Sequence, residues 1–552
     1  MLRATVTPHE LREMLADGRE LAVLDVREEG AFAAGHLLTA ACVPRSRLEM
    51  RIDALVPRRD TRIVLCDDDE TLAQRAAGVM RRFGYGDIAV LLGGVGAWKA
   101  AGFELFTGVN VPSKAFGEFV EHVCETPRIG AAELKAKLDA GEDVVVLDSR
   151  PMAEYRVMNI PGAHDCPGAE LVYRVHEVVK RPGTLVVVNC AGRTRSIIGA
   201  QSLINAGLPN RVVALKNGTM GWQLAGFTLE HGNARHAPAP GAAALAKARA
   251  AAARVAERFG IEIISADDLV LLRRGATRTL YCFDVRSPEE YREGHLPGFV
   301  SAPGGQLVQA TDTYAAVRNA RIVLADSDGV RATMTASWLL QMGWPEVRVL
   351  DHPGATRHPS SGRRGERPPG AQLVTGAEAR RVLGLEGAKL DEVPAPELQR
   401  LIDASEATVV DFASSLGYRD GHVPGAWFAI RARLRDALER IGPAKRFVFT
   451  SPDGVLARLA ALDAVALTEV RVQVLQGGTA AWKAAGHPLE RGSTRLAAVT
   501  DDVYYRPYDH QSQIEQAMQD YLDWEVALVA QIEREPYLRF SCPPDKGGAE
   551  RE

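Results

Sequence analysis

Internal repetition constrains the fold of this 552-residue chain more than any other feature of its sequence. One short pattern recurs four times: an apolar stretch ending in aspartate, then a polar turn, an aromatic residue and a turn that usually reads Gly-His. The four aspartates are Asp25, Asp148, Asp284 and Asp411. The sequence therefore predicts several similar domains rather than one large domain.

A second apolar stretch follows each aspartate at a similar distance. These stretches end at Cys66, Cys190, Ala325 and Thr450, which we align at one position of the repeat. In three copies a tryptophan then follows, and 32 residues separate Cys66 from Trp98, Cys190 from Trp222, and Thr450 from Trp482. In the third copy the matching position is Arg357. Spacing this regular is not expected by chance.

Short strand-like stretches alternate with helical stretches within each copy. In the second copy, strands are predicted over 144–147, 186–189 and 211–215, with one helix beginning at Met152 and another over 196–206. The strands are almost continuously apolar, which is typical of parallel strands buried on both faces. We therefore predict an α/β protein of four tandem domains, each a small parallel sheet flanked by helices, and a C-terminal helical tail. The predicted domains cover 1–108, 126–232, 259–357 and 391–493, and the tail covers 494–552.

The segments outside the copies differ in composition. Residues 109–125 join the first two domains, 242–256 predict an alanine-rich helical spacer, and 358–371 predict a flexible linker. The tail predicts a helix over about 511–534, with a stripe of apolar side chains that includes Tyr521 and Trp524. Such a stripe predicts packing against one of the domains or against a second subunit.

Composition excludes several classes of function. The formal net charge is −4, whereas nucleic-acid-binding proteins usually have a basic excess. No apolar stretch approaches the ~18 residues of a membrane span, and the N-terminus has no apolar signal-peptide core. Seven cysteines are too few for a disulfide scaffold, so we expect a reducing, cytoplasmic location. No metal-binding or nucleotide-binding motif is present, and we expect neither a metal nor another cofactor.

The segment after the second strand of the second copy has the features of a reactive loop. It reads Cys190-Ala191-Gly192-Arg193-Thr194-Arg195-Ser196 and leads into an apolar helix. In open parallel sheets, functional groups lie at this carboxyl edge of the strands. A thiolate there would face unpaired backbone N–H groups, the positive end of the helix dipole and two arginines. This environment predicts a lowered thiol pKa and an anion-binding loop around the sulfur.

These linked motifs resemble those of the rhodanese (sulfurtransferase) superfamily. The resemblance covers most of residues 1–493 and rests on the Asp-x-Arg and Ile-Pro-Gly-Ala motifs, the loop that Cys190 opens, and the Gly-Gly-x-x-x-Trp motif. It implies that Cys190 takes a sulfane sulfur from thiosulfate, glutathione persulfide or 3-mercaptopyruvate, becomes a persulfide, and passes the sulfur to a thiol or to cyanide. It also implies that Ala191, Gly192, Arg193 and Thr194 line the substrate cradle and that Arg195 closes it.

The other three copies are expected to be inactive. Cys66 is followed by four carboxylates, which disfavour a thiolate and repel anionic donors. We expect a buried or inert Cys66, with a second sulfur site for a neutral or cationic donor as the alternative. Ala325 and Thr450 carry no thiol, so their domains are expected to be scaffolds or docking surfaces.

Two other classes of function compete with a sulfurtransferase. In the first, the inactive domains and the tail bind a partner enzyme of sulfur metabolism, or a second copy of the chain, and the protein is a sulfur-relay scaffold. In the second, the chain is a phosphatase or arsenate reductase, as some members of the superfamily are. Four residues separate Cys190 from Arg195, one fewer than in the phosphatase branch, which favours a cradle for a single sulfur atom.

Structural roles are expected for several other residues. Asp148, Arg150 and Glu154 are predicted to form one ion-pair set, and the three tryptophans to anchor the domain cores. Arg174 is expected to be solvent-exposed. The cysteines outside the two loops are expected to be structural or incidental, with Cys166 as a candidate resolving thiol.

Overall fold

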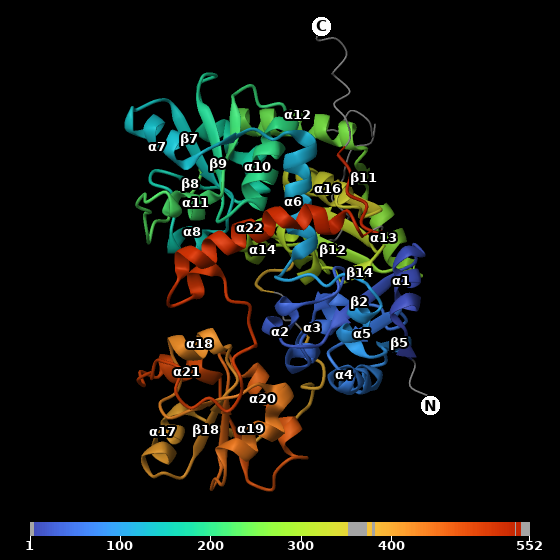
Figure 1. Cartoon of the computed structure of the whole chain (residues 1–552), viewed down its shortest axis with the longest axis vertical. Helices are drawn as coiled ribbons and strands as arrows, with labels where there is room; N and C mark the ends of the chain where they lie inside the picture. The colour runs from blue at the N-terminus through green and yellow to red at the C-terminus, as the bar shows by residue number, and fades with distance from the viewer. Residues whose placement is uncertain (1–4, 276, 352–372, 378–380, 536, 543–552) are drawn as a thin grey trace. The chain divides into compact units, whose positions relative to one another are not determined.

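The computed structural model describes residues 5–275, 277–351, 373–377, 381–535 and 537–542 (Figure 1). It contains four parallel sheets, one in each copy of the repeat, with helices flanking each sheet. The chain groups into two compact units. One unit contains the first and fourth sheets, and the other contains the second and third sheets together with the C-terminal helix. The predicted fold class is confirmed.

The second sheet carries the predicted reactive loop and has the parallel strand order β6-β10-β9-β7-β8. Its strands are β6 (Arg128–Ile129), β7 (Val144–Asp148), β8 (His164–Asp165), β9 (Leu185–Asn189) and β10 (Val212–Leu215). Its helices are α7 (Ala131–Asp139), α8 (Met152–Val157), α9 (Glu170–Val178), α10 (Thr194–Asn205) and α11 (Gly218–Leu224). The strands and helices predicted for this copy are therefore confirmed, with small differences at their ends.

The other three copies have the same strand order. The first contains β1 (Thr5–Val6), α1 (Pro8–Ala16), β2 (Leu21–Asp25), α2 (Glu29–Ala34), β3 (Ala41–Cys42), α3 (Leu48–Leu55), β4 (Ile63–Cys66), α4 (Thr71–Arg82), β5 (Ile88–Leu91) and α5 (Gly94–Ala100). The third contains β11 (Glu262–Ile264), α13 (Ala266–Arg274), β12 (Leu280–Asp284), α14 (Pro288–Glu293), β13 (Val300–Ser301), α15 (Gly304–Gln309), β14 (Val317–Arg318), β15 (Arg321–Ala325), α16 (Arg331–Gln341) and β16 (Glu346–Leu350). The fourth contains β17 (Glu392–Val393), α17 (Ala395–Asp403), β18 (Thr408–Asp411), α18 (Ser415–Asp420), β19 (Trp427–Phe428), α19 (Leu434–Ile441), β20 (Phe447–Thr450), α20 (Val455–Ala464), β21 (Val472–Leu475) and α21 (Gly478–Ala484).

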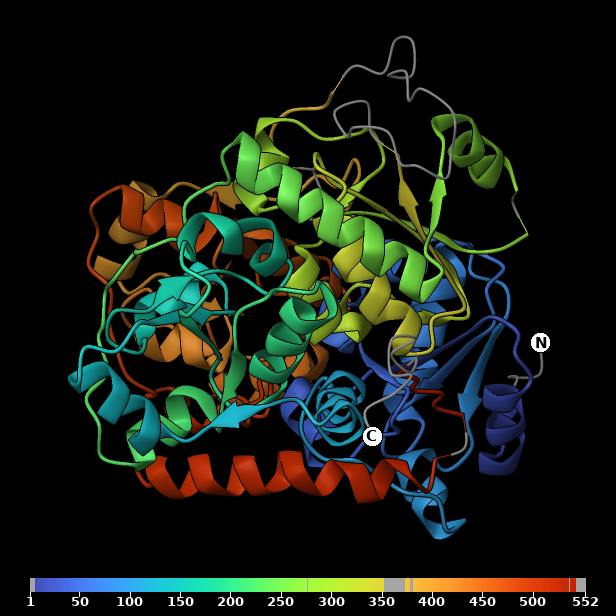
Figure 2. The ribbon, with the colours of Figure 1, turned by 90° about the horizontal axis from the view of Figure 1, so that it is seen from above.

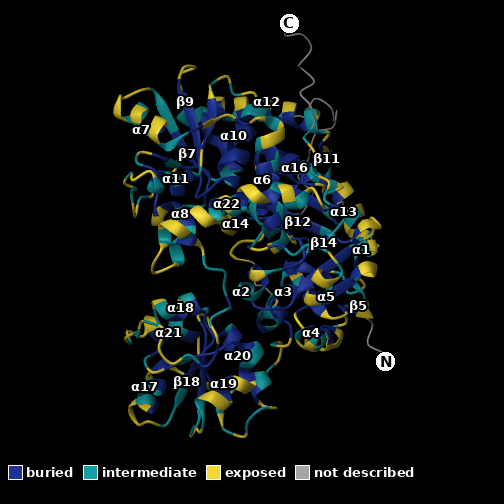
Figure 3. Cartoon of the chain, in the orientation of Figure 1, coloured by how far each residue is buried: buried dark blue, intermediate teal, exposed yellow. Residues whose placement is uncertain are grey.

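Each core forms around the central strands, whose side chains are buried on both faces (Figure 3). In the second domain Trp222 packs into a cluster of aliphatic side chains from β7, β9 and β10. Its indole N–H donates to the carbonyl of Thr228 at 3.0 Å, and Trp98 and Trp482 make the equivalent hydrogen bonds in their domains. The tryptophans are therefore core anchors, as predicted, because this hydrogen bond satisfies the only polar group of the buried ring.

Three helices outside the repeats lie in the unit that contains the second and third domains: α6 (Val111–Cys124), α12 (Ala242–Phe259) and α22 (Ile514–Ile532). The alanine-rich helix is confirmed, but α12 packs against α9 and α16 and is a joint between domains rather than a spacer. Residues 109–125, expected only to join two domains, form α6, which packs against α10 and α22 (Figure 2). The tail helix is confirmed and packs on the second domain. Arg357 and the segment 358–371 lie outside the described residues.

Among the described residues, no helix is both long enough and apolar enough to cross a membrane.

Candidate active site

Backbone hydrogen bonds identify which residues of the four loops are equivalent. The residue after each motif aspartate donates its N–H to the last carbonyl of the second strand, at 2.8–3.0 Å. These pairs are Val26 with Cys66, Ser149 with Asn189, Val285 with Ala325, and Phe412 with Thr450. Cys66, Ala325 and Thr450 are therefore equivalent to Asn189, and the alignment of these three residues with Cys190 is wrong by one position. The residues that occupy the position of Cys190 are Asp67, Asp326 and Ser451.

A second contact supports this correction. The N–H of Thr219, in α11, donates to the carbonyl of Cys190 at 2.9 Å, and the equivalent N–H groups of Val95 and Thr479 donate to Asp67 and Ser451. The equal 32-residue spacings are misleading because the second domain has one residue more between the start of the loop helix and the next strand. This distance runs from Thr194 to Val212, against Thr71 to Ile88 and Val455 to Val472.

The side chains at the Cys190 position show what the other loops bind. Asp67 accepts the backbone N–H groups of Glu70, Leu72 and Ala73 at 2.7–3.0 Å. Asp326 accepts those of Gly329 and Ala332 at 2.7 and 2.8 Å. The Ser451 hydroxyl accepts the N–H of Ala457 at 3.2 Å. In these three copies the loop is thus a nest of N–H groups that holds the first side chain of the loop, a carboxylate in two of them.

Cys190 begins the equivalent loop of the second domain, between β9 and α10. Its side chain is buried, with the residue only 2% exposed. Gly218 allows this packing, because a Cβ there would lie 2.3 Å from the carbonyl oxygen of Cys190, and its φ of +55° favours glycine. The thiol donates to the Ser196 hydroxyl at 3.5 Å, and that hydroxyl donates to the Arg193 carbonyl at 2.7 Å.

The charge environment of the thiol differs from the prediction. Burial raises the pKa of Cys190, and the Glu525 carboxylate acts in the same direction. Arg195 and the hydrogen bonds to Ser196 lower this pKa but do not cancel the effect of burial. The predicted lowering of the thiol pKa is therefore wrong for this closed form of the site, since removing a thiolate from water costs more than one paired guanidinium returns.

Arg195 closes the loop, but it is already paired. Its guanidinium donates two hydrogen bonds to Glu154 on α8, at 2.8 and 2.9 Å. Although burial acts to raise the pKa of Glu154, the guanidinium brings it to about 2. The predicted set of Asp148, Arg150 and Glu154 is thus corrected: Asp148 and Arg150 pair at 2.7 Å, whereas Glu154 belongs to the loop.

Arg193 points to α6 rather than into the cradle. It donates to Glu118 at 2.6 and 2.7 Å and to Glu121 at 2.5 Å. Sequence reasoning missed both glutamates, since the segment that carries them was interpreted as a connection. The apolar period of 111–124 was the available signal, with Phe116 and Val120 four residues apart on its buried face.

The C-terminal helix covers the outer surface of the loop. Met518 and Leu522 of α22 form a buried cluster with Ala191 and Met220. Thr194 donates its hydroxyl to Glu525 at 3.2 Å. The tail thus contributes directly to the environment of the candidate nucleophile.

The remaining cysteines and Arg174 have structural environments. Cys66 and Cys166 are buried, and burial raises the pKa of both thiols. Cys124, at the end of α6, forms a disulfide with Cys542. Arg174 is buried rather than exposed, because it pairs with Glu170 at 2.7 Å and donates to the Ala237 carbonyl at 2.8 Å. Among the described residues, no cluster of three His, Cys, Asp or Glu side chains could hold a metal ion.

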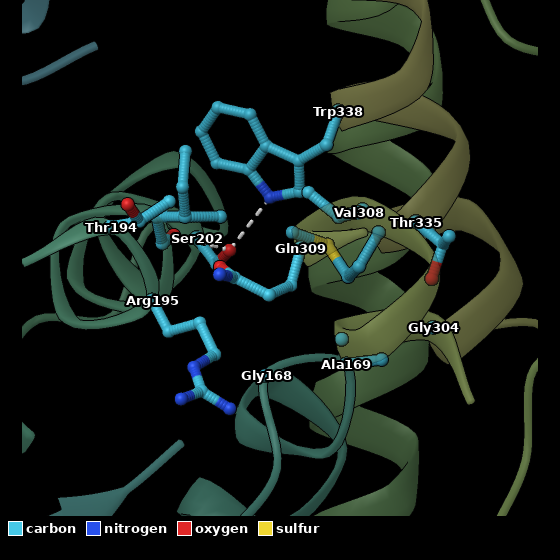
Figure 4. Close-up of a pocket in the computed structure, with 14 residues that line it drawn as sticks. Gly168, Ala169, Thr194, Arg195, Ser202, Gly304, Val308, Gln309, Thr335 and Trp338 are labelled. Atoms are coloured by element: carbon cyan, nitrogen blue, oxygen red, sulfur yellow. Dashed lines mark hydrogen bonds between the residues drawn. The ribbon is translucent and has the colours of Figure 1, made fainter. Parts of the chain in front are cut away.

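A small cavity of about 30 Å³ lies beside the loop, between α10 and the helices α15 and α16 (Figure 4). Thr194 and Arg195 line it on one side and Thr335 and Trp338 on the other, where the Trp338 indole donates to Ser202 at 2.8 Å. Cys190 does not line it. This volume suits about one water molecule, so the cavity is not a substrate site.

Comparison with known proteins follows the same four-part division. The family described as Rhodanese-like domain matches residues 7–101, 130–225, 265–352 and 394–485. A crystal structure of thiosulfate sulfurtransferase from Pseudomonas aeruginosa has 48% sequence identity and a TM-score of 0.91, and the match covers 98% of this chain and 100% of that one.

Curated relatives match single domains. The probable adenylyltransferase/sulfurtransferase MoeZ of Mycobacterium tuberculosis is 33% identical over 96 residues, which are 17% of this chain and 24% of that protein. The uncharacterized protein YqhL of Bacillus subtilis is 34% identical over 94 residues, which are 17% of this chain and 71% of that protein. The chain thus spans about a quarter of the length of MoeZ. Because the matched domains cover more than half of this chain, it belongs to the rhodanese family and contains four rhodanese-like domains.

Proposed function

We propose that this protein is a sulfurtransferase in which Cys190 carries the transferred sulfur as a persulfide. The observation that carries the proposal is the set of side chains at the Cys190 position: the sibling loops hold Asp67 and Asp326 carboxylates through their own N–H groups. The second domain has the same loop with a thiol in that place. An N–H nest that holds a carboxylate also suits the negative charge of a thiolate or persulfide.

The proposed reaction has two displacements. The Cys190 thiolate attacks the outer sulfur of thiosulfate, a new S–S bond forms, and the old S–S bond breaks with its electron pair leaving on sulfite. An acceptor thiolate or cyanide then attacks the outer sulfur of the persulfide, and the Cys190 thiolate is released. Donor and acceptor exchange one neutral sulfur atom, so charge balances in each step without a further oxidant or a cofactor.

The residues from Ala191 to Arg195 have distinct proposed roles. The backbone from Ala191 through Gly192 to Thr194 curves around the sulfur and presents N–H groups to it. Arg195 supplies the cation that most favours the thiolate, while Arg193 holds the loop against α6. The N–H at the sixth position is donated in all three sibling loops, and in this loop it belongs to Ser196.

The first, third and fourth domains are proposed to be inactive. Asp67, Asp326 and Ser451 stand where the nucleophile would be, and a carboxylate or hydroxyl cannot form a persulfide. Thiosulfate is the first donor to test, since the Pseudomonas aeruginosa neighbour is named a thiosulfate sulfurtransferase. Glutathione persulfide and 3-mercaptopyruvate are the other donors. We place the reaction in the cytoplasm, where free thiols persist.

Intact-mass measurement tests this proposal. After incubation with thiosulfate, the wild-type chain should gain about 32 Da, the mass of one sulfur atom, on the peptide that contains Cys190. Cys190→Ser should lose the adduct and the turnover while keeping the wild-type circular dichroism spectrum. Cys66→Ser is the matched control, because it removes a buried thiol that lies one position away from the reactive one, and it should keep most activity. Turnover retained by Cys190→Ser would contradict the assignment.

A further inference from the structure

Glu525 on α22 is a buried carboxylate with an unusual set of contacts. The residue is 1% exposed. One oxygen, Oε1, accepts hydrogen bonds from the Thr194 hydroxyl at 3.2 Å and the Tyr521 hydroxyl at 3.0 Å, and lies 3.4 Å from the Lys114 ammonium. The other oxygen, Oε2, is buried and has no hydrogen-bond partner among the described residues. Burial of an unpartnered carboxylate oxygen is costly, which favours a functional reason for its position.

The unpartnered oxygen faces the loop that contains Cys190. A Cβ added to Gly192 would lie only 2.9 Å from Oε2 of Glu525 and 3.2 Å from the Tyr521 ring. Glycine at the third position of this loop therefore leaves room for the carboxylate. The C-terminal helix, which begins more than 300 residues after the loop, delivers a negative charge to the outer surface of the cradle.

This charge completes the neutralisation of the cations around the loop. Three cations reach it from α10 and α6, and each is paired with a carboxylate at 3.4 Å or less. The pairs are Arg195 with Glu154, Arg193 with Glu118, and Lys114 with Glu525. The cradle thus relies on backbone N–H groups for its affinity for anions, and the strongly positive loop predicted from the two arginines is not present.

We propose that Glu525 is a positioning residue that sets the donor preference of the Cys190 site, by disfavouring donors that bring two negative charges next to the transferable sulfur. This inference rests on the proposed function. Thiosulfate is such a donor, because its sulfonate is bonded directly to the sulfur that is attacked. Glutathione persulfide carries one charge at its terminal sulfur, and its carboxylates are several bonds away.

The same charge acts on the nucleophile. Cys190 is faced by Arg195 and Ser196 of α10, by Glu525 of α22, by Glu154 of α8, and by Tyr508 and Arg506 of the segment before α22. Lys114 and Glu118 of α6 face Glu525. Because Glu525 acts to raise the pKa of the Cys190 thiol, its neutralisation lowers that pKa and shifts the ionisation limb of the rate to lower pH.

Glu525→Gln tests the proposal, since glutamine keeps the shape and an acceptor oxygen for Thr194. We expect kcat/KM for thiosulfate to rise about tenfold relative to that for glutathione persulfide, the order expected when one nearby charge is removed from partly buried surroundings. The pH–rate limb should also move to lower pH. Glu515→Gln removes the same charge from an exposed position in the first turn of α22 and should change neither measurement.

A second variant separates the charge of Glu525 from the loss of its ion pair. Lys114→Met with Glu525→Gln removes both charges, so a ratio that still rises identifies the carboxylate as the cause, and this double variant replaces Glu525→Gln if the single variant does not fold. An unchanged donor ratio and an unchanged pH limb in a folded variant would overturn the inference. Failure of the proposed function itself would be recognised separately, by the absence of a sulfur adduct on Cys190 in the wild-type chain.

Discussion

Replacing Arg195 by alanine tests the electrostatics of the candidate active site. The guanidinium makes two hydrogen bonds to Glu154, and the side chains of Arg195 and Glu154 are 14% and 21% exposed. Truncation removes the cation that lowers the pKa of Cys190 and leaves the Glu154 carboxylate unpaired beside the loop. Both changes act to raise the thiol pKa, so less thiolate is present at neutral pH.

The expected loss follows from the contacts. A hydrogen bond to a charged group contributes ~1.5–3 kcal/mol, which corresponds to a decrease of about tenfold to a hundredfold in kcat/KM for an anionic donor near neutral pH. Because part of this decrease comes from the ionisation of Cys190, the difference from the wild type should shrink as the pH rises. A purely structural role of Arg195 would lower activity equally at every pH.

Two measurements check this prediction: kcat/KM for thiosulfate across pH, and the pH dependence of Cys190 alkylation by iodoacetamide, followed by peptide mass. Arg156→Ala is the matched control, since it removes an exposed arginine from the last turn of α8. Adding Glu154→Gln to Arg195→Ala should restore part of the rate by removing the unpaired charge. An Arg195→Ala enzyme with the wild-type pH profile and donor affinity would refute the reasoning.

Two further predictions concern phosphate and acid. The chain should not hydrolyse aryl phosphates or reduce arsenate, because the loop of four residues between Cys190 and Arg195 suits one sulfur atom better than a phosphoryl group. Phosphate should act only as a weak competitive inhibitor, and a phosphocysteine at residue 190 would contradict this prediction. Glu154→Gln should make folding less sensitive to acid. Since the pKa of Glu154 is held at about 2, below its usual 4.5, the ion pair stabilises the fold above that usual value and the contribution is lost as the pH falls toward 2. Urea midpoints near neutral pH and at about pH 3 should therefore differ more for the wild type than for Glu154→Gln, and equal differences would count against the assignment.

The sequence predicts the repeated fold well because its signals are local. The β-branched runs that form β7 and β9 are buried on both faces of a sheet, and their hydrophobic pattern is visible without any partner. The reactive loop is also a local feature, since Cys190, Arg195 and the start of α10 lie within one short segment. The alignment of the other loops failed because it relied on counting residues to a tryptophan, and one additional residue between α10 and β10 compensated for a shift of one position in the loop.

The sequence by itself determined four α/β domains, the identity of the loop with a candidate thiol nucleophile, and a tail helix with an apolar stripe. Only the tertiary structure decided the charge around that thiol. Glu118 and Glu525 reach the loop from helices 75 and 331 residues away in sequence, and each neutralises a cation that the sequence placed beside an open cradle. Burial then raises the thiol pKa in spite of Arg195. Desolvation and long-range ion pairing depend on what packs against a residue, and neither is encoded in the spacing of the residues next to it.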